Sequence, residues 1–182
     1  MNTANKLTML RVIMIPAFLV VLYMNPPFAS VISLLIFVAA SLTDLLDGYI
    51  ARNYNQTTDF GKFMDPLADK CLVIAAMLWF VEVGQMPAWA LLIVVVREFA
   101  VSGLRMQAAN LGKVIAAGWS GKVKTASTMV CICIMLVLPG MTFLGGVADI
   151  LNGLCVAVIV VTTLYSGIEY LLVNREVFSS MK

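Results

Sequence analysis

The chain has 182 residues, of which 62% are hydrophobic and 12% are charged, and its mean hydropathy is +0.97. Soluble domains carry about 25% charged residues, so the composition excludes an ordinary soluble domain. It predicts an all-α, polytopic membrane protein formed by a single domain over residues 1–182. The net charge of +2 gives no reason to expect a nucleic-acid partner.

Histidine is absent from the sequence. Its absence removes the commonest general base and the commonest metal ligand, which leaves carboxylates for proton transfer. Carboxylates favour hard cations such as Mg²⁺ or Mn²⁺. The four cysteines lie in apolar segments without metal-type spacing, and we expect them to be buried as small hydrophobic residues: Cys71, Cys131, Cys133 and Cys155.

Six apolar segments are long enough to cross a membrane, since a spanning helix needs about 20 residues. They predict a bundle of six transmembrane helices over residues 7–24, 30–52, 62–83, 88–110, 124–138 and 146–173. Lys6 and Arg11 before the first apolar core would also suit a signal peptide. Asn25-Pro26-Pro27 favours a turn between two spans instead.

Lysines and arginines cluster on one side of this predicted topology. They lie near the N-terminus, the second and fourth connections and the C-terminus, whereas the other connections contain none. The positive-inside rule therefore predicts that both termini are cytosolic.

Four aspartates interrupt the second and third predicted helices. Asp44 and Asp47 are three residues apart, and Asp65 and Asp69 are four apart, so each pair shares a helix face. Asp44 precedes Arg52 by eight residues and Asp69 follows Gly61 by eight. At about 1.5 Å per residue, both lie about 12 Å into their helices, so the two pairs match in depth.

Carboxylates inside a membrane are costly unless a metal, a partner or water compensates them. Four oxygen donors on two antiparallel helices suit two Mg²⁺-type ions, with substrate phosphate completing their coordination. A solvated polar face is the structural alternative. Gly48 and Ala51 allow close approach of a helix or ligand, and Arg52 suits either a phosphate contact or a membrane-surface anchor.

The eight spaced positions resemble the signature of the CDP-alcohol phosphatidyltransferase family. They are Asp44, Asp47, Gly48, Ala51, Arg52, Gly61, Asp65 and Asp69, with eight residues between Arg52 and Gly61. The resemblance implies a six-helix membrane enzyme, generally dimeric, in which an alcohol displaces CMP from a CDP-linked donor with the help of divalent metals.

Carried over by residue, the resemblance implies two ions, Mg²⁺ or Mn²⁺, held by the four aspartates. Asp69 would also be the general base that takes the proton of the attacking hydroxyl. The family resemblance and the position of the remaining polar or small residues predict contacts with CDP-diacylglycerol at Asn5, Thr8, Gly48, Ala51, Arg52, Thr58 and Gly61.

The acceptor is expected to contact a second set of basic residues. Arg97 and Arg105 share a face of the fourth predicted helix, and Lys122 and Lys124 open the fifth. Arginine near mid-span is expensive and usually faces a cavity or partner, here an acceptor phosphate or else Glu98 or Glu169. For the lysines, anchoring to anionic lipids is the alternative.

The segments REFAVSGLR and WSGKVKT are similar to the family branch that makes phosphatidylglycerophosphate from glycerol 3-phosphate. We therefore expect CDP-diacylglycerol and glycerol 3-phosphate as substrates, membrane lipids and a second copy as partners, and a bacterial plasma membrane as the location. A sister enzyme that uses inositol phosphate or serine is the nearest alternative. A divalent-cation carrier is a further one, although Gly48, Ala51 and Arg52 do not suit a cation path.

Overall fold

The computed structural model describes residues 3–53, 59–110, 118–141 and 145–175. Within these ranges, the side chains of residues 3–7, 44–53, 59–66, 69, 109 and 110 lie outside the description. The described residues form six α-helices and one short 3₁₀ turn, without a strand. The all-α prediction is therefore confirmed for this part of the chain.

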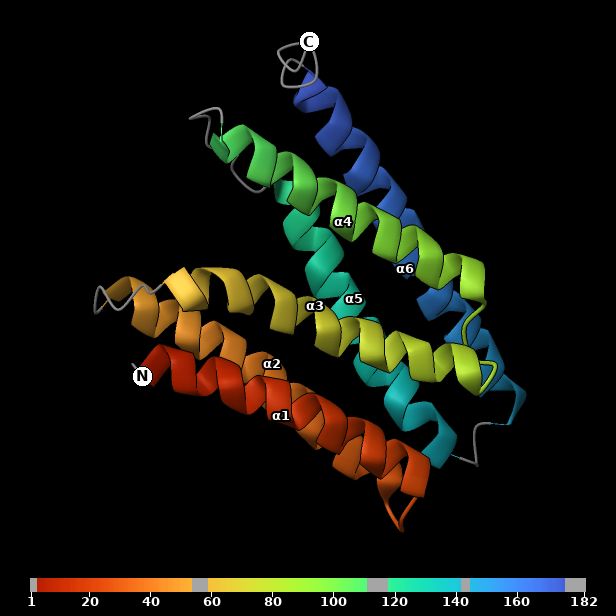
Figure 1. Ribbon diagram of the computed structural model, residues 1–182. Coiled ribbons are helices and arrows are strands. Elements are labelled where there is room, and N and C mark those ends of the chain that lie inside the picture. The colour runs from red at the N-terminus through yellow and green to blue at the C-terminus, as the bar shows by residue number, and fades with distance from the viewer. Residues whose placement is uncertain (1–2, 54–58, 111–117, 142–144, 176–182) are drawn as a thin grey trace.

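The helices follow one another with short connections (Figure 1). They are α1 (Thr3–Met24), α2 (Ala29–Asn53), α3 (Asp59–Glu82), α4 (Ala88–Asn110), α5 (Trp119–Val137), the 3₁₀ turn η1 (Leu138–Gly140) and α6 (Gly146–Val173). The predicted segments correspond to these six helices one by one. Helix α3 begins three residues before the predicted start at 62, and α5 begins five before 124.

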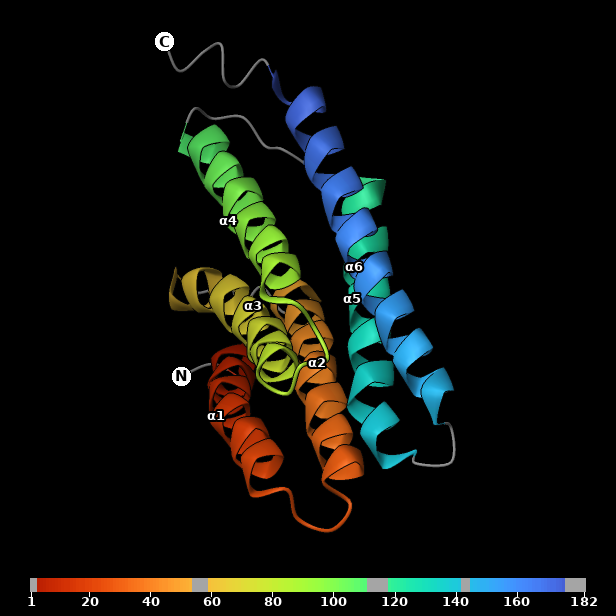
Figure 2. The same cartoon turned by 90° about the vertical axis from the view of Figure 1, so that its right-hand side faces the viewer.

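Two groups of three helices make up the bundle (Figures 1 and 2). Helices α1 and α2 form a hairpin against which α3 packs, and α5 and α6 form a hairpin that α4 covers. Contacts of α2 with α5 and of α3 with α4 join the two groups. The core between them is apolar and includes Phe18, Phe37, Met77, Ile132 and Ile159.

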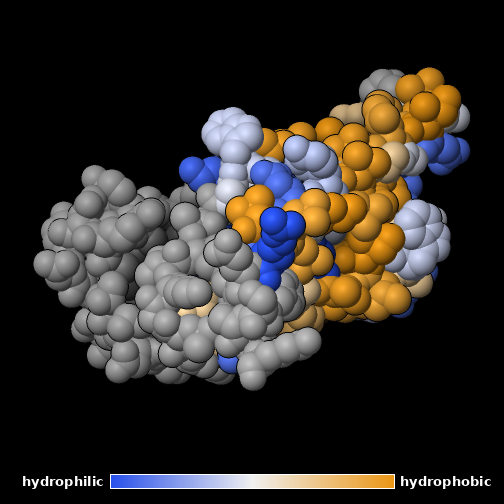
Figure 3. Space-filling model, turned by 90° about the horizontal axis from the view of Figure 1, so that it is seen from above, coloured by the Kyte–Doolittle hydropathy of each residue, from blue (hydrophilic) through white to orange (hydrophobic). Residues whose placement is uncertain are grey.

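The outer surface is also rich in apolar side chains (Figure 3). Phe99 on α4 and Ile168 on α6 are 62% and 57% exposed. Among the described residues, the segments 119–140 and 146–173 are long and apolar enough to cross a membrane. Large exposed apolar surfaces mark contact with lipid or with another protein, so these helices suit a bilayer.

The expectation that all four cysteines are buried is wrong for Cys71. Cys131 and Cys155 are buried and Cys133 is half-buried, whereas Cys71 is exposed. Cys71 lies four residues after Leu67, which is itself 46% exposed, so both belong to the outer face of α3. An apolar neighbourhood in sequence cannot distinguish that face from the core, because both are apolar in such a bundle.

Candidate active site

The two aspartate pairs lie on helices that pack against each other. Asp44 and Asp47 belong to the second half of α2, and Asp65 and Asp69 to the first half of α3. The side chains of these residues and of Asn5, Gly48, Ala51, Arg52 and Gly61 lie outside the described part, as does the whole of Thr58. Among the described residues, no group of three potential ligands could hold a metal ion.

Thr8 is the one member of the predicted donor-binding set whose side chain is described. It lies on α1 and is 1% exposed. Helix α1 contacts both α2 and α3, so Thr8 is inside the group of helices that carries the aspartates.

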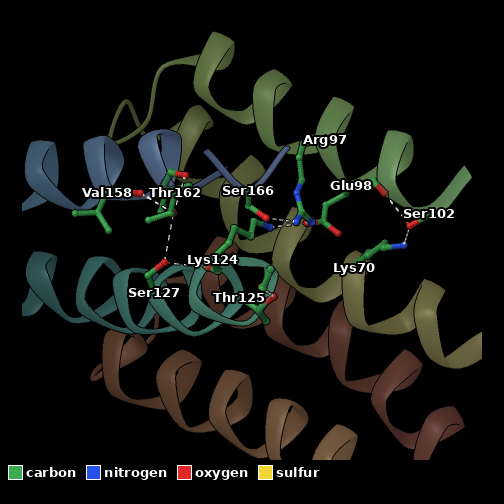
Figure 4. A network of polar contacts seen from close by, with 12 residues as sticks. Lys70, Arg97, Glu98, Ser102, Lys124, Thr125, Ser127, Val158, Thr162 and Ser166 are labelled. Carbon is green, nitrogen blue, oxygen red and sulfur yellow. Dashed lines mark hydrogen bonds and ion pairs between the residues drawn. The ribbon is translucent and has the colours of Figure 1, made fainter. Parts of the chain in front are cut away.

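A cluster of polar side chains joins α4, α5 and α6 (Figure 4). Glu98 Oε1 accepts an ion-pair contact from Arg97 Nη1 at 3.1 Å and from Lys124 Nζ at 2.5 Å. Arg97 Nη2 also donates to Ser166 Oγ at 2.5 Å. The side chains are 12% exposed for Arg97, 19% for Glu98 and 5% for Lys124, so the cluster lies mostly inside the bundle.

Helix α3 contributes Lys70 to the same neighbourhood. Lys70 Nζ donates to Ser102 Oγ, and this hydroxyl donates at 2.7 Å to the carbonyl oxygen of Glu98. Lys70 follows Asp69 directly in sequence, so the polar cluster reaches the helix that carries the predicted general base. We call Lys70, Arg97, Glu98, Ser102, Lys124 and Ser166 the polar cluster.

Two glycines leave room for the Arg97 side chain. A Cβ atom at Gly167 of α6 would lie 3.2 Å from Arg97 Cγ, and one at Gly121 of α5 would lie 3.7 Å from Arg97 Nη2. The distance of 3.2 Å at Gly167 is shorter than an ordinary van der Waals contact. Small residues therefore let α4, α5 and α6 approach one another around this arginine.

The polar cluster has an excess of positive charge. Lys70, Arg97 and Lys124 contribute three formal positive charges, whereas Glu98 contributes one negative charge, which leaves a formal net charge of +2. A buried excess of positive charge is favourable only when an anion or water compensates it. Phosphate oxygens suit these groups, because arginine offers a fork of donors and lysine a mobile point charge.

A small cavity lies inside this region, between α3, α4 and α5. It measures about 40 Å³, and its polar lining comes from Lys70, Glu98, Lys124, Thr125 and Thr128. The Oγ1 atom of Thr128 is buried and has no hydrogen-bond partner among the described residues.

The other predicted acceptor residues have different surroundings. Arg105 is exposed and holds its guanidinium group 5.6 Å from the centre of the Tyr170 ring, a cation–π arrangement. Lys122 is exposed at the beginning of α5. The structure thus brings Arg97 and Lys124 together through Glu98, and it places Arg105 and Lys122 outside the polar cluster.

Three members of this region received no role from the sequence: Lys70, Thr128 and Ser166. Lys70 had a signal, because it directly follows an aspartate of the signature within a largely apolar predicted helix. Thr128 and Ser166 had none, since single hydroxyl residues are common in apolar helices and usually bond to their own backbone.

A family model and individual relatives match nearly the whole length of the chain and point to the same family. The family model for CDP-alcohol phosphatidyltransferase matches residues 1–165. The chain is 38% identical to the CDP-diacylglycerol–glycerol-3-phosphate 3-phosphatidyltransferase of Bacillus subtilis, over 96% of both chains. It is 39% identical to the protein of that name in Salmonella paratyphi A, over 96% of this chain and 95% of the other.

A probable phosphatidylglycerophosphate synthase of Mycobacterium tuberculosis is 37% identical, over 93% of this chain and 79% of its own length. The signature on α2 and α3 and the similarity along nearly all of the sequence agree. The chain therefore belongs to the CDP-alcohol phosphatidyltransferase family.

Proposed function

We propose that the protein transfers a phosphatidyl group from CDP-diacylglycerol to sn-glycerol 3-phosphate. The observation that carries this assignment is the similarity to enzymes named for this reaction, which extends over 96% of the chain. The positively charged polar cluster gives independent support, because an acceptor that carries its own phosphate needs such a site.

In the proposed reaction, a hydroxyl oxygen of glycerol 3-phosphate attacks the phosphorus that bears the diacylglycerol. A new P–O bond forms, the bond to the CMP oxygen breaks, and CMP leaves with that electron pair. Asp69 takes the proton of the attacking hydroxyl, which makes the oxygen a better nucleophile. The products are phosphatidylglycerophosphate and CMP.

Two groups of residues divide the binding work in this proposal. Arg97 and Lys124 bind the acceptor phosphate, and their contacts with Glu98 hold both side chains in position before the acceptor arrives. For the donor, the candidates are those named from the sequence: Asn5, Thr8, Gly48, Ala51, Arg52, Thr58 and Gly61.

The four aspartates fit a divalent cation by the chemistry of their donors, since Mg²⁺ and Mn²⁺ prefer carboxylate oxygens. Asp44, Asp47, Asp65 and Asp69 would hold two such ions. When bound, the ions neutralise charge on the diphosphate of the donor. Removal of divalent ions with a chelator should abolish CMP release, and Mg²⁺ should restore it.

The arrangement in the membrane is also a proposal. We infer that all six helices span a bacterial plasma membrane, with both termini and the aspartates toward the cytosol, where a water-soluble acceptor is available. The basic residues near the expected cytosolic connections support this orientation. The family resemblance supports a homodimer.

The direct test is an assay of CMP release by the purified protein in detergent with CDP-diacylglycerol and Mg²⁺. Glycerol 3-phosphate, inositol phosphate and serine are supplied separately as acceptors. We expect release with glycerol 3-phosphate and little with the other two. Release with inositol phosphate or serine, and none with glycerol 3-phosphate, would assign the chain to a sister enzyme.

A further inference from the structure

Thr128 differs from most of the described hydroxyl residues in having an unpaired side chain. Its neighbours on α5 bond to their own helix: Thr125 Oγ1 to the Gly121 carbonyl and Ser127 Oγ to the Lys124 carbonyl, each at 3.0 Å. Thr128 is 2% exposed, and within the part of the chain that the structure describes its Oγ1 has no hydrogen-bond partner. A buried hydroxyl without a partner is unfavourable, so this site favours a ligand or water that supplies one.

The cavity beside Thr128 limits the size and the chemistry of a ligand that could bind there. Thr128 lines the cavity of about 40 Å³ together with Lys70, Glu98 and Lys124, while Val73 and Val94 supply apolar wall. A water molecule needs about 10–15 Å³ measured in this way, so the cavity has room for about three groups of that size. That space is too small for a whole glycerol 3-phosphate but suits one carbon that carries a hydroxyl.

Glycerol 3-phosphate has two hydroxyl groups, and only one of them reacts. We propose that the cavity receives the C2 hydroxyl of the acceptor and that Thr128 Oγ1 forms a hydrogen bond with it. Thr128 is then a specificity-determining residue for a polyol phosphate. This inference rests on the proposed function, because it assumes that glycerol 3-phosphate is the acceptor.

The position of the cavity agrees with that role. Lys124 and Glu98 belong both to its lining and to the polar cluster that would bind the acceptor phosphate. Lys70 lines the cavity from α3, and it directly follows the predicted general base Asp69 in sequence. In this arrangement, the phosphate of the acceptor contacts the polar cluster and its reactive hydroxyl lies toward α3. The middle carbon of the acceptor is then close to Thr128.

The test compares two acceptors and four proteins. Glycerol 3-phosphate and 3-hydroxypropyl phosphate both carry a phosphate and a primary hydroxyl, and only the former has a C2 hydroxyl. The proteins are the full-length wild type, Thr128→Val, Thr128→Ser and Thr163→Val. Thr163 is a matched control, because it is 0% exposed and its Oγ1 is unpaired among the described residues. It lines a different groove between α4 and α6, in which Arg97 is the one charged lining residue.

A lost hydrogen bond of about 1 kcal/mol corresponds to a change of about fivefold. We expect Thr128→Val to lower kcat/KM for glycerol 3-phosphate by about five- to tenfold and to change it for 3-hydroxypropyl phosphate by less than about twofold. Thr128→Ser keeps the hydroxyl and should retain the wild-type preference, as should Thr163→Val.

Equal losses with both acceptors, or an unchanged preference in Thr128→Val, would overturn the inference while the proposed function stands. A wild-type protein that uses neither acceptor would contradict the proposed function itself, and the inference with it. Thermal unfolding of each variant in detergent separates a folding defect from these outcomes, because a folding defect in Thr128→Val would lower its thermal midpoint below the midpoints of Thr128→Ser and Thr163→Val.

Discussion

Lys122 and Lys124 lie two residues apart on α5 and have opposite environments. The side chain of Lys124 is 5% exposed and paired with Glu98, whereas Lys122 is exposed in the first turn of the helix. Both residues were predicted to bind the acceptor phosphate. The structure favours Lys124, because a phosphate contact in a buried site is screened less by water and salt.

The pair provides a matched comparison. We expect Lys124→Met to raise KM for glycerol 3-phosphate by about tenfold or more, since hydrogen bonds to charged groups contribute about 1.5–3 kcal/mol. Lys122→Met should change KM by less than about twofold. Steady-state kinetics at saturating CDP-diacylglycerol measures both values, and equal effects of the two substitutions would contradict this assignment.

Asp69 carries the proposed proton transfer. Asp69→Asn keeps the size of the side chain but removes the basic oxygen, so CMP release should fall by about a hundredfold or more. Asp149→Asn is the control, because Asp149 lies in the first turn of α6, away from the signature. The proposed role is wrong if Asp69→Asn retains activity close to that of the control at saturating Mg²⁺.

Helix α6 contributes Gly167 to the site in addition to Ser166. A Cβ atom at Gly167 would lie 3.2 Å from Arg97 Cγ, whereas one at Gly153 of the same helix would meet nothing within 4 Å. Alanine is favoured over glycine in a helix by about 1 kcal/mol, so Gly153→Ala should be neutral or stabilising.

Gly167→Ala should instead move Arg97 and loosen its contact with Ser166. We expect KM for glycerol 3-phosphate to rise several-fold and the thermal midpoint to fall relative to Gly153→Ala. Kinetics and thermal unfolding in detergent measure the two effects. If both alanine variants behave alike, the close approach of α6 to Arg97 does not matter for the acceptor site.

The number and order of the helices could be predicted from the sequence, since each apolar run of about 20 residues gives one helix. Their beginnings were less predictable. Hydropathy locates the apolar part of a helix, but the hydrogen-bonded backbone continues past it, as α3 does from Asp59 and α5 from Trp119.

The roles of the aspartates could be predicted from the sequence, whereas the contacts of the polar cluster and of Thr128 could not. The aspartates form a spaced motif within one stretch of sequence, so their roles could be proposed from it. The pairing of Lys124 with Glu98 joins residues 26 positions apart on different helices, and no local pattern encodes it. The unpaired state of Thr128 likewise depends on how α3, α4 and α5 meet.

At the scale of the molecule, the proposed orientation brings the soluble acceptor and the lipid donor to the same side of the membrane. Both termini should then be cytosolic. Epitope tags at the two ends should resist an impermeant protease in intact spheroplasts and be cleaved after lysis. Cleavage of one tag before lysis would contradict the predicted even number of spans, and cleavage of both tags would contradict the orientation.

The central claim is that the protein joins a phosphatidyl group to glycerol 3-phosphate. The most direct measurement supplies the purified protein, in vesicles with CDP-diacylglycerol and Mg²⁺, with equal concentrations of glycerol 3-phosphate, inositol phosphate and serine, and identifies the lipid product by mass. We predict that phosphatidylglycerophosphate is the dominant product and that CMP is released in equal amount. A dominant product with inositol phosphate or serine as its head group, or no new lipid, would contradict the claim.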